Sequence, residues 1–293
     1  MDETFIPCVL RELPPNLWPA ADAIAVQENP ANAPPLHRLS KLAEVLGLPE
    51  IHPERISVIT SKYWGAKGVK LGVSFMDTPS QEIRSRILKY LNLWNAKGAN
   101  ILFQESAQGE VRIARTPGEG YYSYLGTDIL SIQAGECTMN LDSITMSTPD
   151  AECMRVIPHE GGHTLGCPHE HMRAELVARI DPNKAIQYFW QTQRWTPQDV
   201  YQQVLTPLNE RNLMGTPVDQ TSSMCYQLPG SITFDGQPIT GGSHVNETDF
   251  AFMGKIYPGA VVPPVVPPDA VGDKKIITLT FPVPVPVPKV THR

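Results

Sequence analysis

The 293-residue chain has few of the features that mark a membrane, disulfide-rich or nucleic-acid-binding protein. No run approaches the roughly 18 uninterrupted apolar residues of a membrane span, so none is expected. Five cysteines are too few for a disulfide scaffold, and their odd number leaves at least one unpaired within the chain. A net charge of −6 argues against nucleic acid as a partner, because phosphate binding needs a basic surface. No basic region followed by an apolar stretch opens the chain, so no signal peptide is visible.

The composition is that of a globular protein, with 41% apolar and 18% charged residues, and it divides the chain into three parts. Residues 1–60 are rich in proline and acid, so we expect a partly ordered prosegment or covering segment there. Residues 61–258 carry the patterns of a folded domain. Residues 259–293 contain Val-Pro repeats, which favour polyproline II. This tail is expected to be a stiff linker or, alternatively, to bind a proline-recognising partner.

An α+β fold is predicted from the patterns between residues 69 and 164. Apolar residues alternate over 69–75, as in a half-buried strand. A long helix is expected between Thr78, its predicted N-cap, and Gly98, with one apolar face. Further strands are expected at residues 101–104, 111–115, 128–133 and 138–142, and further helices from residues 148, 181, 196 and 246. Strands and long helices in this order predict a helix packed on one face of a sheet.

Four of the eight histidines fall within thirteen residues, in the stretch HEGGHTLGCPHEH. Helical residues four apart lie on one face about 6 Å apart, so His159 and His163 can bind one metal ion. Gly166 permits the left-handed conformation that ends a helix, and His169 then returns as a third ligand. Three imidazoles leave one position of tetrahedral Zn²⁺ open, as in catalytic sites, and Glu160 can reach a water bound there. By chance this pattern occurs in about a few in 100,000 chains of this composition.

The residues around this motif oppose helix formation. An interior proline, here Pro158, costs about 3 kcal/mol, and each of Gly161 and Gly162 costs about 1 kcal/mol relative to alanine. Sequence that defies propensity is expected at functional sites. We therefore expect a kink or one lost hydrogen bond, with the helix retained.

With these residues the chain resembles the metzincin zinc endopeptidases, and it is most similar to the astacin type because Glu170 and a histidine follow the third ligand. A Met-turn of the form Ser-x-Met-x-Tyr occurs at residues 222–226, and it includes Ser223, Met224 and Tyr226. The resemblance implies that Met224 forms an apolar floor beneath the metal. It also implies that Tyr226 binds zinc at rest and swings to stabilise the oxyanion.

The resemblance also implies an architecture. A twisted mixed sheet with two long helices forms the N-terminal subdomain, the C-terminal subdomain is mostly irregular or helical, and the active-site cleft lies between them. Residues 120–127 and 138–141 resemble the strand region whose edge strand pairs with extended substrate. The family is usually secreted, which favours secretion although no export signal is visible. Glu170 would form an ion pair with a buried mature N-terminus, or would be an ordinary carboxylate.

The cysteines leave several alternatives open. A thiolate is an excellent zinc ligand, so Cys8 can occupy the open position and keep the enzyme latent, or it is an unpaired or surface cysteine. Cys167 and Cys225 can form a disulfide beside the metal, or remain two buried thiols. A second disulfide can join Cys137 and Cys153. The remaining histidines have no motif support and are expected to be structural or exposed: His37, His52, His171, His244 and His292.

The predicted activity is that of an endopeptidase with one catalytic Zn²⁺, acting on protein or peptide substrates. Glu160 acts as general base on a metal-activated water, and Tyr226 holds the developing oxyanion. Two other functions stay open at this point. One is a zinc-dependent, non-catalytic binding module on a protease-like scaffold, and the other is a metal hydrolase of non-peptide amides.

Overall fold

The computed structural model describes residues 8–32, 61–208, 214–215 and 217–259. The Val-Pro repeats, and three of the histidines without motif support, lie outside these residues. No described helix combines the length and the apolar character needed to cross a bilayer.

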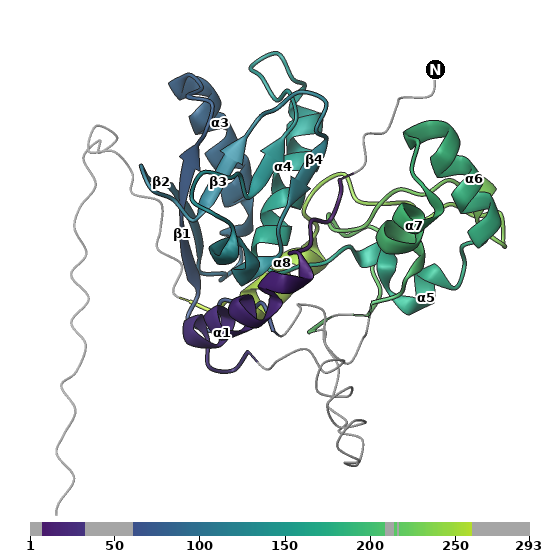
Figure 1. The fold of residues 1–293 in the computed structure, drawn as a ribbon, viewed down its shortest axis with the longest axis horizontal. Helices are drawn as coiled ribbons and strands as arrows, with labels where there is room; N and C mark the ends of the chain where they lie inside the picture. The colour runs from purple at the N-terminus through teal and green to yellow at the C-terminus, as the bar shows by residue number, and fades with distance from the viewer. Residues whose placement is uncertain (1–7, 33–60, 209–213, 216, 260–293) are drawn as a thin grey trace, which may run out of the picture. The chain divides into compact units, whose positions relative to one another are not determined.

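A five-stranded mixed sheet forms one layer of the molecule (Figure 1). Its strands are β1 (Val69–Phe75), β2 (Ile101–Glu105), β3 (Val111–Ala114), β4 (Tyr121–Ser123) and β5 (Met139–Leu141), in the order β2-β1-β3-β5-β4. Strand β4 runs antiparallel to β5 at one edge, whereas the other pairs are parallel. The mixed sheet and the α+β class agree with the prediction.

One predicted strand is wrong. Residues 126–131 form a 3₁₀-helix, and the edge strand comes earlier, at β4. Gly126 has a φ of +47° and turns the extended chain, so that the N–H of Thr127 donates to the carbonyl of Lys62. Ile129 and Ile132 are both buried and lie three residues apart, which is the period of a 3₁₀-helix.

Two long helices, α3 (Gln81–Leu91) and α4 (Asp150–Thr164), pack against each other and the sheet. Helix α3 continues as a 3₁₀-helix over Asn92–Trp94. It starts later than predicted, because Thr78 adopts a left-handed φ of 46° and Ser80 takes the N-cap position. Helix α4 continues through Pro158, whose carbonyl accepts a hydrogen bond from the Trp94 indole at 2.8 Å.

The chain after the metal motif is mostly irregular, with short helices. These are α5 (Ala174–Val177), α6 (Pro182–Gln193), α7 (Pro197–Val200), a π-helix (Tyr201–Leu205) and α8 (Glu247–Ile256), with 3₁₀-helices at Glu170–Met172 and Gly230–Ile232. Three of them start where predicted. Asp181 accepts two N–H groups at the start of α6, while Thr196 and Asn246 form capping boxes before α7 and α8.

The N-terminal segment, defined here as residues 8–32, packs on the sheet edge and the loop beyond it. It comprises residues 8–14, a 3₁₀-helix (Pro15–Leu17) and α1 (Trp18–Glu28). Leu13 and Ala21 pack against Ile132 in a small apolar cluster of their own. The Asn32 side chain donates to the carbonyl of Tyr63 at 2.9 Å and so ties the end of the segment to the domain.

Candidate active site

The metal-motif histidines meet at the C-terminal end of α4. His159 and His163 lie on one face of α4, with ring centroids 4.7 Å apart. Gly166, at a φ of +95°, turns the chain back, and the His169 ring then lies 4.6 Å from that of His163 and 5.2 Å from that of His159. The structure thus brings together the three predicted ligands.

Backbone carbonyls orient two of the rings. The Nδ1–H of His159 donates to the Ser223 carbonyl at 2.6 Å, and that of His163 donates to the Cys167 carbonyl at 2.7 Å. Each donation leaves the Nε2 lone pair of that ring free for a metal. The Nε2 of His163 lies 3.1 Å from the Nε2 of His169. Two nitrogens bound to one tetrahedral zinc are about 3.3 Å apart, given Zn–N bonds of about 2.0 Å.

The three rings are buried, and this burial keeps them neutral. Burial lowers the pKa of His159 to about 4 and lowers the pKa values of His163 and His169 well below their usual range. Neutral imidazole is the form that binds metals. The Nε2 of His159, the atom that its Nδ1–H donation leaves free for a metal, has no hydrogen-bond partner among the described residues. Unpaired buried polar atoms are costly, so this donor set fits a bound zinc ion.

Glu160 is fully buried beside the three rings. Its Oε2 accepts a hydrogen bond from the Cys8 thiol at 3.3 Å, and its Oε1 has no partner among the described residues. Burial raises the pKa of Glu160 to about 8. The carboxyl group can therefore hold or release a proton near neutral pH.

Close packing explains the two glycines that oppose helix formation, and for Gly162 the neighbour is the Met-turn. A Cβ atom on Gly162 would lie 2.3 Å from the sulfur of Met224, and one on Gly161 would lie 3.0 Å from a methyl of Leu91. Helix α4 therefore approaches Met224 too closely for a side chain at position 162. The carboxylate of Asp249 accepts from the Ser223 N–H at 2.9 Å and so fixes the turn.

Tyr226 and His171 stack beside the third histidine. Their rings are 4.3 Å apart and nearly parallel, and the Tyr226 ring lies 4.3 Å from that of His169. The His171 Nε2–H donates to the backbone carbonyl of Gln203 at 3.0 Å. His171 was expected to be structural or exposed, and it is buried against the predicted oxyanion phenol. Its place two residues after His169 was the only signal of this contact.

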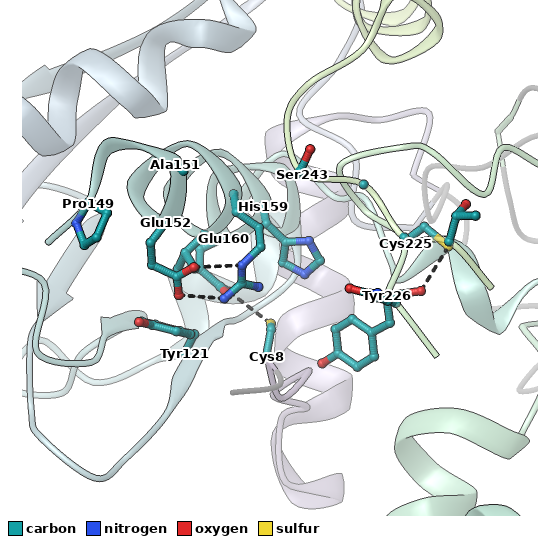
Figure 2. Close-up of a pocket in the computed structure, with 16 residues that line it drawn as sticks. Cys8, Tyr121, Pro149, Ala151, Glu152, His159, Glu160, Cys225, Tyr226 and Ser243 are labelled. Carbon is teal, nitrogen blue, oxygen red and sulfur yellow. Dashed lines mark hydrogen bonds and ion pairs between the residues drawn. The ribbon is translucent and has the colours of Figure 1, made fainter. Parts of the chain in front are cut away.

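Cys8 enters the site from the N-terminal segment (Figure 2). Its sulfur and one nitrogen from each of the three histidines all lie within 4.8 Å of one another. The neighbouring Val9 N–H donates to the carbonyl of Tyr121 in β4 at 2.9 Å. Cys8 is 5% exposed, so the surface alternative is wrong.

The family model of the astacin peptidases matches residues 59–239. The chain belongs to the astacin family. One solved structure of myroilysin is 31% identical, covers 69% of this chain and 98% of its own, and has a TM-score of 0.65. A second myroilysin structure is 27% identical, covers 86% and 99%, and has a TM-score of 0.50.

A hatching-enzyme zinc-protease, high choriolytic enzyme 1 of the medaka fish Oryzias latipes, is 20% identical with a TM-score of 0.46, and covers 68% of this chain and 95% of its own. No curated protein matches the chain. Family membership decides among the three functions that the sequence left open. The protein is a zinc-dependent endopeptidase with one catalytic zinc, and its substrates are proteins or peptides.

The ion pair of Glu170 with a mature N-terminus stays a prediction, because it concerns the chain after its N-terminal segment is removed. Glu170 forms its ion pair with Arg173, at 3.2 Å, and accepts from the N–H of Asp219. Burial raises the pKa of Glu170 to about 7. All five cysteines are free thiols, so neither predicted disulfide forms, and Cys167 and Cys225 are the two buried thiols of the alternative.

A cavity of about 530 Å³ opens next to His159 and Glu160. The first turns of α4 form one wall, where Arg155 pairs with Glu152 at 2.6 Å (Figure 2). Residues 240–243, which follow the Met-turn, form the opposite wall. The cavity is large enough to hold a substrate side chain beside the site.

Proposed function

We propose that His159, His163 and His169 hold the catalytic zinc of this endopeptidase and that Glu160 is its general base. The observation that carries this proposal is the convergence of three buried, neutral imidazoles beside a buried carboxyl group. When bound, zinc polarises the scissile carbonyl and lowers the pKa of a coordinated water towards about 7. Glu160 accepts the proton of the attacking water and delivers it to the leaving amine.

The residues around the ligands would hold this arrangement in place. Tyr226 is proposed to ligate zinc at rest and then to stabilise the oxyanion through its phenol O–H, and its position against His169 supports this role. Met224 would form the floor of the site under α4. Gly166 would adopt the left-handed conformation that ends α4, which lets the chain turn and bring His169 back to the site.

We infer further that the N-terminal segment keeps the chain latent through Cys8. The thiol lies among the nitrogens of the three histidines and also donates to Glu160. On binding zinc the sulfur would become a thiolate and its proton would pass to Glu160, so the open zinc position would be occupied and the general base would be protonated. The segment lies along the sheet edge at the same time, because residue 8 forms a bridge with Tyr121 in β4 and residue 11 forms one with Tyr124, just beyond β4.

The Glu160→Gln variant of the full chain, compared with wild type, tests the assignment of the base. Glutamine keeps the shape of glutamate but cannot take up a proton. We expect bound zinc, measured by metal analysis, to stay stoichiometric, while cleavage of a labelled peptide falls about 10²- to 10⁴-fold. Glu175→Gln, at an exposed position in α5 outside the cavity, is the matched control for removal of a carboxylate. Full activity in Glu160→Gln would contradict the assignment.

The remaining organisation is proposed from the sequence. Residues 61–258 would be the catalytic domain, and the family match to residues 59–239 supports most of this range. The N-terminal segment would be removed or displaced on activation. The tail, residues 259–293, would serve as a stiff linker or bind a proline-recognising partner. Mass spectrometry of the termini of the active form tests these boundaries.

A further inference from the structure

Residues 9–11 of the N-terminal segment lie in the cleft as an extended strand with partners on both sides. On one side Val9 donates its N–H to the carbonyl of Tyr121, and Arg11 forms a bridge with Tyr124. On the other side is Leu10. In an extended chain the main-chain groups of successive residues face alternate sides, so Leu10 faces away from β4.

A single side chain takes the place of a neighbouring strand on that second side. The N–H of Leu10 donates to Oε1 of Gln203 at 3.0 Å, and its carbonyl accepts from Nε2 of Gln203 at 3.3 Å. The amide of Gln203 therefore binds both main-chain groups of one residue. It contacts no side-chain atom of Leu10 through these bonds, so the contact is independent of that residue's identity.

The position of Gln203 is fixed by the active site itself. Gln203 is 6% exposed and lies in the π-helix Tyr201–Leu205, a form of helix that occurs frequently at functional sites. Its backbone carbonyl accepts from the His171 ring, which stacks on Tyr226. The amide is thus held at a fixed place relative to the proposed zinc ligands.

We propose that Gln203 is a substrate-positioning residue of this peptidase. When the N-terminal segment leaves, the amide of Gln203 binds the N–H and carbonyl of one substrate residue, opposite β4. Cys8 lies at the metal site and Leu10 lies two residues further along, so this substrate residue is two positions from the scissile bond. The inference rests on the proposed function, because it takes the histidine cluster as the place of cleavage.

The primary amide suits a substrate that runs in either direction along β4. Half a turn about its last torsion exchanges Oε1 and Nε2, so both hydrogen bonds form again when the chain direction is reversed. The amide also restricts which residue the substrate can carry at the paired position. Proline at the paired position has no N–H, and it would leave Oε1 of the buried amide without a donor. The enzyme would therefore disfavour proline there and tolerate most other residues.

Peptides with single backbone changes test this role. Each labelled peptide carries one ester in place of one amide, at successive positions on both sides of the scissile bond, and kcat/KM is measured. The zinc-loaded full chain is used in whichever state cleaves peptides, as purified or after limited proteolysis. For wild type, the ester two positions from the scissile bond, on one side, should lower kcat/KM about tenfold, as expected for one lost hydrogen bond at a buried partner.

Three variants decide whether Gln203 makes this contact. Gln203→Leu should cleave the all-amide peptide about tenfold more slowly and lose the sensitivity to the ester. Gln203→Glu keeps an acceptor for the substrate N–H, so it should keep the ester sensitivity. If Gln203→Leu fails to fold, the test rests on this variant. Gln202→Leu, at the exposed neighbour, is the matched control and should behave as wild type in both respects.

A Gln203→Leu enzyme with the full ester sensitivity of wild type would overturn the proposal, because its lower rate would then reflect a structural role. A wild-type enzyme equally indifferent to every ester would overturn it too. Failure of the proposed function is seen separately. It appears as full activity in Glu160→Gln. The effect of the ester on kcat/KM can still be compared between wild type and Gln203→Leu in that case.

Discussion

Two regions of the molecule meet at the candidate active site and are held there in different ways. Helix α4 supplies His159, Glu160 and His163 from a buried helix that packs on the sheet and on the Met-turn. The N-terminal segment supplies Cys8 through a few main-chain bonds, to Tyr121 and to Gln203. Each such bond contributes only about 1 kcal/mol, so we expect residues 8–11 to part from the site more readily than α4, although the rest of the segment is also held by the apolar cluster around Ile132 and by Asn32. The comparison is thus between a permanent site and a proposed removable cover.

The largest effect is expected from Cys8→Ala in the full chain. Loss of the thiol frees the open zinc position and Glu160, while Leu10 stays paired with Gln203, so the cover is weakened but remains. Cleavage of a labelled peptide by the intact variant should rise at least about tenfold over intact wild type, since a thiolate–zinc bond is strong. Cys137→Ala, a cysteine away from the site, is the control. Unchanged activity with the segment still attached would refute latency through this thiol.

The rate of zinc release should show the next largest effect of the N-terminal segment on the site. The three imidazoles from α4 and the turn after it are proposed to hold the ion in both proteins, but only wild type offers the Cys8 thiolate as an additional ligand. We expect a chelator to remove zinc from Cys8→Ala about tenfold faster than from intact wild type. The measurement is zinc transfer to a colorimetric chelator. Equal rates would mean that Cys8 does not bind the metal.

The two regions also differ in how well the sequence predicts them. The spacing of His159 and His163, four residues apart on a helix, is local, and so is the turn at Gly166. The metal motif, the helix and most strands could therefore be predicted. The hydrogen bond between Cys8 and Glu160 spans 152 positions and that between Leu10 and Gln203 spans 193. Periodicity carries no information about such pairs, because they depend on the tertiary fold.

Errors within the predicted region have local causes. The strand predicted at 128–133 failed because Gly126 turns the chain and a three-residue spacing fits a 3₁₀-helix. The role of His171 was missed because no motif position is assigned to it. The sequence shows that Gly162 opposes helix formation. The reason for a glycine there, the nearby sulfur of Met224, could not be predicted, because it depends on the packing of two segments that are distant in the sequence.

Gly162→Ala tests how closely α4 packs on the Met-turn. Alanine favours the helix by about 1 kcal/mol, but its methyl would meet the Met224 sulfur, and overpacking costs about 1–3 kcal/mol. We expect a net loss of about 1 kcal/mol in the free energy of unfolding, measured with denaturant. Gly161→Ala is the matched control, because its methyl meets the flexible end of Leu91 at 3.0 Å and the Trp94 ring at an ordinary contact distance of 3.4 Å, and it should be neutral or stabilising. Equal effects of the two variants would contradict the close packing of α4 on the Met-turn.

The smallest effect concerns the outer contacts of the removable cover. Arg11 lies 4.3 Å above the ring of Tyr122 and 3.8 Å from the carboxylate of Glu119, with 42% of its side chain exposed. Exposed contacts of these kinds contribute about 0.5–1 kcal/mol, so Arg11→Ala should speed dissociation of the segment about two- to fivefold.

Alkylation of Cys8, followed by mass spectrometry, measures this opening. Added salt should diminish part of the difference between Arg11→Ala and wild type, because it screens the ion pair with Glu119. Substitution of the exposed neighbour Glu12 by glutamine serves as control for surface changes in the segment. An alkylation rate identical to that of wild type would show that the main-chain bonds of Val9 and Leu10 hold the cover without help from Arg11. In that case the bonds to Tyr121 and Gln203 govern the opening together with the apolar packing of Leu13 and Ala21 and the hydrogen bond of Asn32, and the first two are the same contacts that are proposed to receive the substrate.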